Sequence, residues 1–307
     1  MSERIGLAFL GTNDYGPAFY TWHGDRITPE PTKYVQSAVQ EAFDLDRFFV
    51  AMTEEARTQN GDALADQMEL EPLSIPQSSG EEQFWNVFDA LAGAVPSGAD
   101  LTIDVTHGFR SLPVVGLSIA VYLQASSHAE VERIVYGEYS GENQEAPLRD
   151  LTPFLSLIEW SVAARQLLRD GSAEALAALM DEIQGTAYRT GAEVKPKHAQ
   201  TAAGQLESLT DALSVVQPQD VGGSGASSLT GALQKVQSDV ERVPQLRPLA
   251  VLLEKIRDRL APMEASSLFG EEGFRAQAEM MKFFLETGQL QQAVTLAREA
   301  LVSFQSI

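Results

Sequence analysis

The feature that most constrains the fold is the run of residues 104–113, whose sequence is DVTHGFRSLP. It follows the apolar residues 101–103, which predict a buried strand, and precedes the apolar residues 114–124, which predict a helix. A helix N-terminus offers free backbone N–H groups and the positive end of the helix dipole, so this strand–turn–helix arrangement is suited to bind an anion. The candidate ligand-binding residues of this run, called the Thr106 loop, are Thr106, His107, Gly108, Phe109, Arg110 and Ser111.

A second candidate loop follows the first predicted strand. The apolar run Ile5–Leu10 ends at a glycine, and strands then alternate with helices through residue 150. This alternation predicts an α/β domain with a parallel sheet. Ligands bind at the carboxyl ends of the strands of such sheets, so we expect both loops to lie at the same edge. The candidate ligand-binding residues of this Gly11 loop are Gly11, Thr12, Asn13, Asp14 and Tyr15.

The second half of the chain predicts helices, which divides the protein into domains over residues 1–150 and 151–307. Thr152 and Pro153 form an N-cap signal for a long helix that is expected to continue through Ile183. Loops are predicted at 72–80 and 217–228 from their proline, glycine and serine content. Further helices are predicted over residues 198–216, 229–243, 246–260, 273–286 and 290–304.

Composition excludes several classes of protein. The chain has no cysteine, which rules out disulfides and thiolate metal sites, and no metal or cofactor is expected. The formal net charge is −21, of which residues 1–150 carry −16 (8 Lys and Arg, 24 Asp and Glu) and residues 151–307 carry −5 (14 and 19). Broad nucleic-acid binding needs a basic surface, so a compact anion held by local groups fits better. We expect a cytoplasmic protein without a membrane segment.

Two motifs resemble a known family. Residues 104–108, DVTHG, match the D-x-T-H-G motif of CRISPR-associated proteins with a CARF (CRISPR-associated Rossmann fold) sensor, and residues 9–15, FLGTNDY, resemble the opening of the same family. The resemblance is looser over 151–307, where residues 296–301 resemble a helix of the family's C-terminal HEPN ribonuclease domain. It implies a Rossmann-like sensor followed by an all-α, HEPN-like domain. It also implies a homodimer that binds cyclic oligoadenylate, with cyclic tetra-adenylate favoured, in type III CRISPR defence, and RNA as a substrate of the effector domain.

With such a ligand, the loop residues have separable roles. Neutral His107 can contact a ribose hydroxyl or base edge, and its protonated form can pair with phosphate. Arg110 has two alternatives, a bidentate phosphate contact or a salt bridge to an acidic neighbour or partner subunit. Tyr15 is expected to stack on an adenine. Asp104 would repel phosphate, and we expect it to accept hydrogen bonds from the loop that follows it.

The ribonuclease motif of the family, Arg followed by His after four to six residues, is absent. None of the four histidines has an arginine at that spacing; the nearest candidate is Arg189, nine residues before His198. The chain is therefore expected either to stop before its catalytic motif or to lack it naturally. Two alternatives to a sensor with its own nuclease stay open. One is an enzyme that cleaves its cyclic ligand by orienting a 2′-hydroxyl without metal, and the other is a sensor or scaffold for a separate effector chain.

Overall fold

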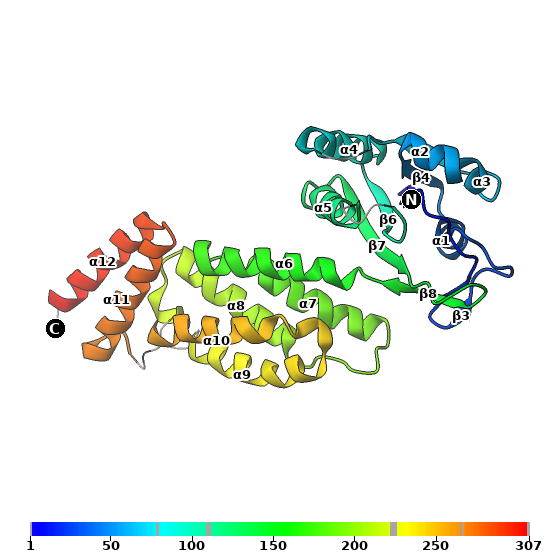
Figure 1. Ribbon diagram of the computed structural model, residues 1–307. Coiled ribbons are helices and arrows are strands. Elements are labelled where there is room, and N and C mark those ends of the chain that lie inside the picture. Colours follow the sequence, from blue (N-terminus) through cyan, green and yellow to red (C-terminus); the bar gives the residue numbers. More distant parts are fainter. Residues whose placement is uncertain are drawn as a thin grey trace. The chain divides into compact units, whose positions relative to one another are not determined.

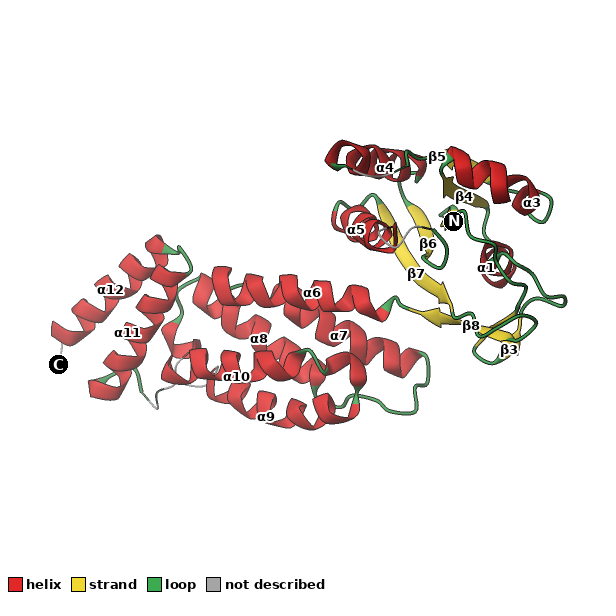
Figure 2. Ribbon diagram, viewed as in Figure 1, coloured by secondary structure: helices red, strands yellow, loops and turns green. Residues whose placement is uncertain are grey.

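The structure is a computed structural model that describes residues 2–77, 80–108, 112–221, 226–263, 265 and 267–305. The chain divides into two compact units, Met1–Leu155 and Ser156–Ile307. Figure 2 shows the strands in the first unit, and the elements assigned between Pro153 and Gln305 are helices. Three of the predicted site residues, Phe109, Arg110 and Ser111, lie outside the described residues.

The first unit is built on one mixed, mostly parallel sheet of eight strands in the order β3-β2-β8-β7-β6-β1-β4-β5 (Figure 1). Strands β7, β6, β1, β4 and β5 run parallel to one another, whereas β8 is antiparallel to β7 and β3 is antiparallel to β2. The predicted α/β class with a parallel sheet core is confirmed for this unit. The strands are β1 (Arg4–Leu10), β2 (Phe19–Trp22), β3 (Asp25–Arg26), β4 (Arg47–Met52), β5 (Glu71–Ser74), β6 (Ala99–Asp104), β7 (Ala129–Gly137) and β8 (Glu145–Asp150).

Both faces of the sheet are covered, because successive side chains of a strand point to opposite sides. In β1, Ile5, Leu7 and Phe9 pack in one cluster with apolar side chains of α4 and α5. Ala8 and Leu10 pack in a second cluster with α1, α2 and α3. This double burial explains why β1 reads as a continuous apolar run. The helical segments of this unit are α1 (Val35–Phe43), α2 (Glu54–Ala56), the π-helix η1 (Arg57–Gly61), α3 (Asp62–Ala65), α4 (Glu81–Ala94) and α5 (Leu112–Ala125).

The strand order reverses at β1. After β1 the chain first forms β2 and β3 at the far end of the sheet. It then forms β4 and β5 on one side of β1, and later β6 and β7 on the other side. Helix α1 packs on one face of the sheet and α5, which follows β6, packs on the other face. Open α/β sheets bind ligands at the carboxyl ends of the strands at such a switch point. The Gly11 loop follows β1 and the Thr106 loop follows β6, so the fold places both candidate loops at this switch point.

Some elements of the first unit differ from the prediction. The segment predicted as a loop at 72–80 contributes to strand β5, and three short strands, β2, β3 and β8, were not predicted. β5 lies at the sheet margin with mostly exposed residues, so it carries no apolar run, and Pro72 is tolerated at such a position. β8 contains Pro147 and pairs with β7 on one side and β2 on the other. Tertiary pairing, rather than local pattern, creates these strands.

The second unit consists of helices around one apolar core. The single helix predicted from Pro153 to Ile183 is wrong, because it is interrupted at Gly171. This glycine has φ +75°, and a Cβ there would lie 2.9 Å from the Phe283 ring. The other helices predicted for this unit are confirmed within a few residues. Its helical segments are α6 (Pro153–Arg165), the π-helix η2 (Gln166–Asp170), α7 (Glu174–Arg189), α8 (Ala199–Ser214), α9 (Ala226–Arg242), α10 (Leu249–Leu260), α11 (Gly270–Glu286) and α12 (Leu290–Gln305).

Candidate functional site

The two candidate loops meet, as predicted from the sheet. Strands β1 and β6 are parallel neighbours with Ala8 opposite Asp104. The loops are so close that a Cβ on Gly11 would lie 3.2 Å from Cα of Gly108. Gly108 itself has φ +111°, a conformation that other residues rarely adopt. Two glycines therefore let the backbones approach each other, and both loops open at the carboxyl edge of the sheet.

Asp104 holds the Thr106 loop in place through hydrogen bonds. Its Oδ1 accepts hydrogen bonds from the Thr106 backbone N–H at 2.9 Å and from the Thr106 hydroxyl at 2.5 Å. The same hydroxyl oxygen accepts the backbone N–H of Gly137 at 2.7 Å, which ties the loop to the end of β7. Asp104 is fully buried, and burial raises its pKa to about 6, although the bonds from Thr106 act in the opposite direction. The predicted structural role of Asp104 is confirmed by these contacts.

His107 is covered by Tyr15 of the other loop. Their rings stack with centroids 3.8 Å apart and planes inclined by 29°. The Tyr15 hydroxyl accepts the Gly11 backbone N–H at 3.0 Å, which fixes the tyrosine over the histidine. One face of Tyr15, the residue expected to stack on an adenine, is thus occupied by His107 in this structure.

The His107 ring is shielded from water even though parts of the residue are accessible. Its Nε2 is buried and has no hydrogen-bond partner among the described residues. Burial lowers its pKa to about 4, while an interaction with the backbone of Lys33 acts in the opposite direction. The imidazole is therefore neutral at pH 7, and its Nε2 is free to bond to a group that enters the site. A buried polar atom without a partner costs free energy that such a group would recover.

Two contributors to the site were not predicted. Asn60, in the π-helix η1, donates from Nδ2 to the carbonyl oxygens of Gly11 at 2.8 Å and Asn13 at 3.0 Å, which fixes the path of the Gly11 loop. Lys33 forms an ion pair with the exposed carboxylate of Asp14 at 3.2 Å. Nothing in the local sequence around Asn60 distinguishes it, because it lies in a polar surface helix. π-Helical turns do occur at functional sites, but they have no reliable sequence signature.

The other predicted residues of the Gly11 loop lie toward solvent. Thr12 is partly buried, and Asn13 and Asp14 are exposed. A side chain at Gly16 would collide with the Tyr139 hydroxyl, so the segment that follows β7 also borders this loop. Among the described residues, no group of three or more His, Cys, Asp or Glu side chains is arranged to hold a metal ion. No helix in the described part of the chain has the length and apolarity to cross a membrane.

The fold and these loops define a class, an α/β domain with a preformed polar site at the switch point of its sheet. Comparison with curated proteins finds a similarity over part of the chain. Over 85 residues, or 26% of this chain, the sequence is 28% identical to the CRISPR-associated protein MJ1674 of Methanocaldococcus jannaschii, of which the match spans 13%. No protein-family profile matches the chain. The similarity supports an association with CRISPR systems.

Proposed function

We propose that the first unit binds a cyclic oligoadenylate and that the second unit passes the binding signal to an effector in a CRISPR system. Three observations support the proposal. The two loops meet at the position where α/β sheets bind ligands. Their polar groups are local, which suits a compact anion in a domain that carries a net charge of −16. The chain is also similar to a CRISPR-associated protein.

The observation that carries the proposal is His107. Its Nε2 is buried, lacks a partner among the described residues and lies where the two loops meet. A neutral imidazole can donate to or accept from a ribose hydroxyl or a base edge. A ligand that displaces Tyr15 would gain this nitrogen and would also free the backbone N–H of Gly11 for an anionic oxygen. A ring of repeated nucleotides would contact the same groups of two copies across a twofold axis.

Isothermal titration against cyclic tri-, tetra- and hexa-adenylate tests the proposal. We expect one ring, the tetra-adenylate, to bind, and His107→Ala to weaken binding at least ~10-fold, which corresponds to about 1.4 kcal/mol. His23→Ala is the control, because His23 lies in the turn between β2 and β3, with three strands separating β2 from β1. Absence of binding to every ring, or equal losses in both variants, contradicts the proposal.

Binding of the ligand and its cleavage at a 2′-hydroxyl that the loops orient are separate activities. Chromatography of each ring after prolonged incubation with excess protein distinguishes the two activities. We expect intact rings. Linear products that disappear in His107→Ala would establish the cleaving enzyme instead.

The output of the signal is proposed to be RNA cleavage by a HEPN-type nuclease. Since the expected Arg–His motif is absent from residues 1–307, this activity is assigned to residues or chains other than those present here. Copurification from cells that express the whole CRISPR locus, followed by mass spectrometry, tests the assignment. A bound protein with the Arg–His motif supports it, and a ligand-stimulated ribonuclease activity of the purified chain alone contradicts it.

A further inference from the structure

Side chains of the Gly11 loop occupy the groups of the candidate site that a ligand would use. The ring of Tyr15 stacks on the His107 ring with centroids 3.8 Å apart. The Tyr15 hydroxyl oxygen accepts the backbone N–H of Gly11 at 3.0 Å. The carboxylate of the preceding residue, Asp14, forms an ion pair with Lys33 at 3.2 Å. Two consecutive residues thus present an anion, an aromatic ring and a hydroxyl oxygen, which are the groups that a nucleotide also carries.

Lys33 belongs to the site through both its backbone and its side chain. Its backbone interacts with the His107 ring, and its ammonium group reaches the Gly11 loop at Asp14. It is the single lysine of residues 1–150, which carry a net charge of −16. A lysine ammonium is a compact charge that binds phosphate well. Because the Asp14 side chain is 91% exposed, its ion pair with Lys33 is weak and a phosphate can replace the carboxylate.

The backbone on both sides of Tyr15 is anchored, so rotation of side chains is enough to open the site. Asn60 donates hydrogen bonds to the carbonyl oxygens of Gly11 and Asn13. A backbone hydrogen bond of 2.7 Å from the segment between β7 and β8 holds Pro17. Rotation of exposed side chains is faster than rearrangement of a loop. The loop is therefore a fixed frame from which the side chains of residues 14 and 15 can turn outward, and this arrangement is called the open form.

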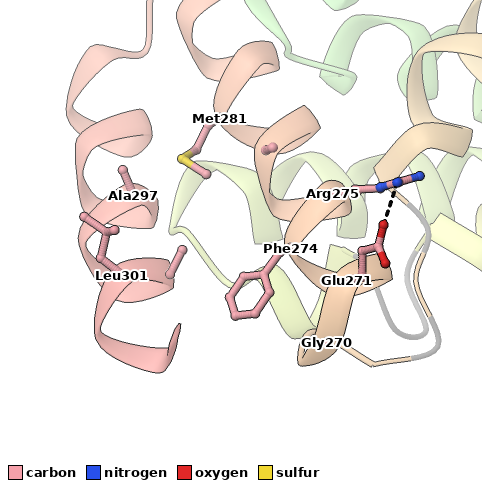
Figure 3. Close-up of a pocket in the computed structure, with 9 residues that line it drawn as sticks. Gly270, Glu271, Phe274, Arg275, Met281, Ala297 and Leu301 are labelled. Atoms are coloured by element: carbon pink, nitrogen blue, oxygen red, sulfur yellow. Dashed lines mark hydrogen bonds and ion pairs between the residues drawn. The ribbon is translucent and has the colours of Figure 1, made fainter. Parts of the chain in front are cut away.

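A groove of about 990 Å³ between α11 and α12 of the second unit has a different chemistry (Figure 3). Its lining is mostly apolar and includes Phe274, Met281 and Leu301. Glu271 and Arg275, which also line it, form an ion pair with each other at 2.6 Å. A phosphate would meet the Glu271 carboxylate beside the arginine there, so this groove does not suit a nucleotide. The nucleotide-like contacts described above belong to the loops of the first unit.

We propose that Asp14 and Tyr15 act as an internal mimic of one nucleotide, which a ligand must displace, and that Lys33 then binds the phosphate of the ligand. This inference rests on the proposed function and adds a form of self-inhibition to it. The apparent affinity equals the intrinsic affinity multiplied by the fraction of the open form. With about a tenth of the molecules open, removal of the mimic tightens binding about 10-fold. The sequence-based expectation that Tyr15 stacks on an adenine predicts the opposite effect.

Titration of the purified whole chain with cyclic tetra-adenylate tests the mimic. Tyr15→Ala should bind about 10-fold more tightly than the native protein. Tyr15→Phe, which keeps the ring but loses the hydroxyl bond to Gly11, should fall between the two. Asp14→Asn should also bind more tightly, and Lys33→Ala more weakly. Unchanged or weaker binding by Tyr15→Ala overturns the mimic, and unchanged binding by Lys33→Ala overturns the role of the lysine.

Asp44→Asn is the matched control for the change of charge. Asp44 forms an ion pair with Arg4 at 3.0 Å, and its side chain is 89% exposed, against 91% for Asp14. Arg4 begins β1, whereas the Gly11 loop follows the other end of this strand. The control should bind cyclic tetra-adenylate as the native protein does. Equal gains by Asp14→Asn and Asp44→Asn would show a general charge effect and overturn the mimicry of phosphate by Asp14.

Diethyl pyrocarbonate tests the closure of the site without a ligand, because it acylates neutral imidazole nitrogens that it can reach. In the native protein we expect His107 to react more slowly than His23, which is exposed in the turn between β2 and β3. Tyr15→Ala should accelerate the reaction of His107, followed by mass spectrometry of its peptide. Equal rates for His107 in both proteins overturn the mimic.

The two measurements separate this inference from the proposed function. If the native protein binds the ring and Tyr15→Ala binds it no more tightly, the mimic is wrong and the proposed function stands. If no variant binds any ring while Tyr15→Ala accelerates acylation of His107, the proposed function is wrong and the closure by Tyr15 stands.

Discussion

Removal of the Tyr15 ring should expose His107 to water and raise the pKa of its imidazole. In the native protein burial lowers that pKa from 6.5 to about 4, a difference of 2.5 units that corresponds to roughly 3 kcal/mol against the charged form. Tyr15 covers one face of the ring at a centroid distance of 3.8 Å. We therefore expect Tyr15→Ala to recover at least ~1 pKa unit, or about 1.4 kcal/mol.

The measurement is a pH titration of the histidine ring resonances by NMR between about pH 3 and pH 8, which covers both the lowered pKa of His107 and the range in which unperturbed histidines titrate. The chain has four histidines, so His107→Gln assigns the signal. Tyr15→Phe should keep the stack and the low pKa, and Tyr188→Ala, which removes a tyrosine that is 52% exposed on α7 of the second unit, should change nothing. The reasoning is refuted if native His107 titrates near pH 6.5, or if Tyr15→Ala leaves its titration unchanged.

Three further substitutions test residues that hold the two loops in place. The free energy of unfolding of the whole chain is measured with urea for each, with Val251→Ala, at a position 65% exposed on α10, as the control. Asn60→Ala removes two hydrogen bonds to the Gly11 loop and one from the Tyr34 hydroxyl, and should cost about 1–3 kcal/mol; an unchanged midpoint would show that Asn60 does not hold the Gly11 loop. Gly11→Ala places a Cβ 2.9 Å from the Tyr15 hydroxyl and should cost about 1–3 kcal/mol and loosen the stack, seen as a raised pKa of His107. Asp104 has a folded pKa of about 6, above its unfolded value, so its contribution to stability is lost as pH rises from about 4 to 6. Asp104→Asn should therefore gain about 1 kcal/mol relative to the native chain between pH 5 and pH 7, and a pH-independent difference would contradict this.

Much of the first unit follows from its sequence because its central strands are buried on both faces. The run Ile5–Leu10 is apolar without alternation, and Leu101 and Ile103 flank a buried threonine; these segments form the adjacent strands β1 and β6. Because the two strands are parallel, the loops that follow them lie at the same edge of the sheet. By contrast, β2, β3, β5 and β8 lie toward the margins and exist through pairing with neighbours. Their sequences are short or polar, so no local period indicates them.

The candidate site was predictable in its position but not in its internal contacts. Glycine and threonine after a strand indicate a loop that can approach a ligand, and Gly11 and Gly108 do meet. The stack of Tyr15 on His107 joins residues 92 positions apart and depends on side-chain rotamers, which sequence alone does not specify. Asn60 bonds to Gly11, a residue 49 positions away in the sequence, so this contact is also not visible in a local pattern. The break at Gly171 has a local cause instead, because this glycine ends the helix in the left-handed conformation with φ +75°.

The two edge strands of the eight-stranded sheet, β3 and β5, disfavour aggregation by strand addition. A sheet margin with free backbone groups invites strands of other molecules to add to it. At one margin β3 is only two residues long, and both of them, Asp25 and Arg26, are charged and exposed. At the other, β5 is four residues long and contains Pro72, which has no N–H to donate. Neither edge strand offers a long, regular template on which the strand of another molecule could extend the sheet.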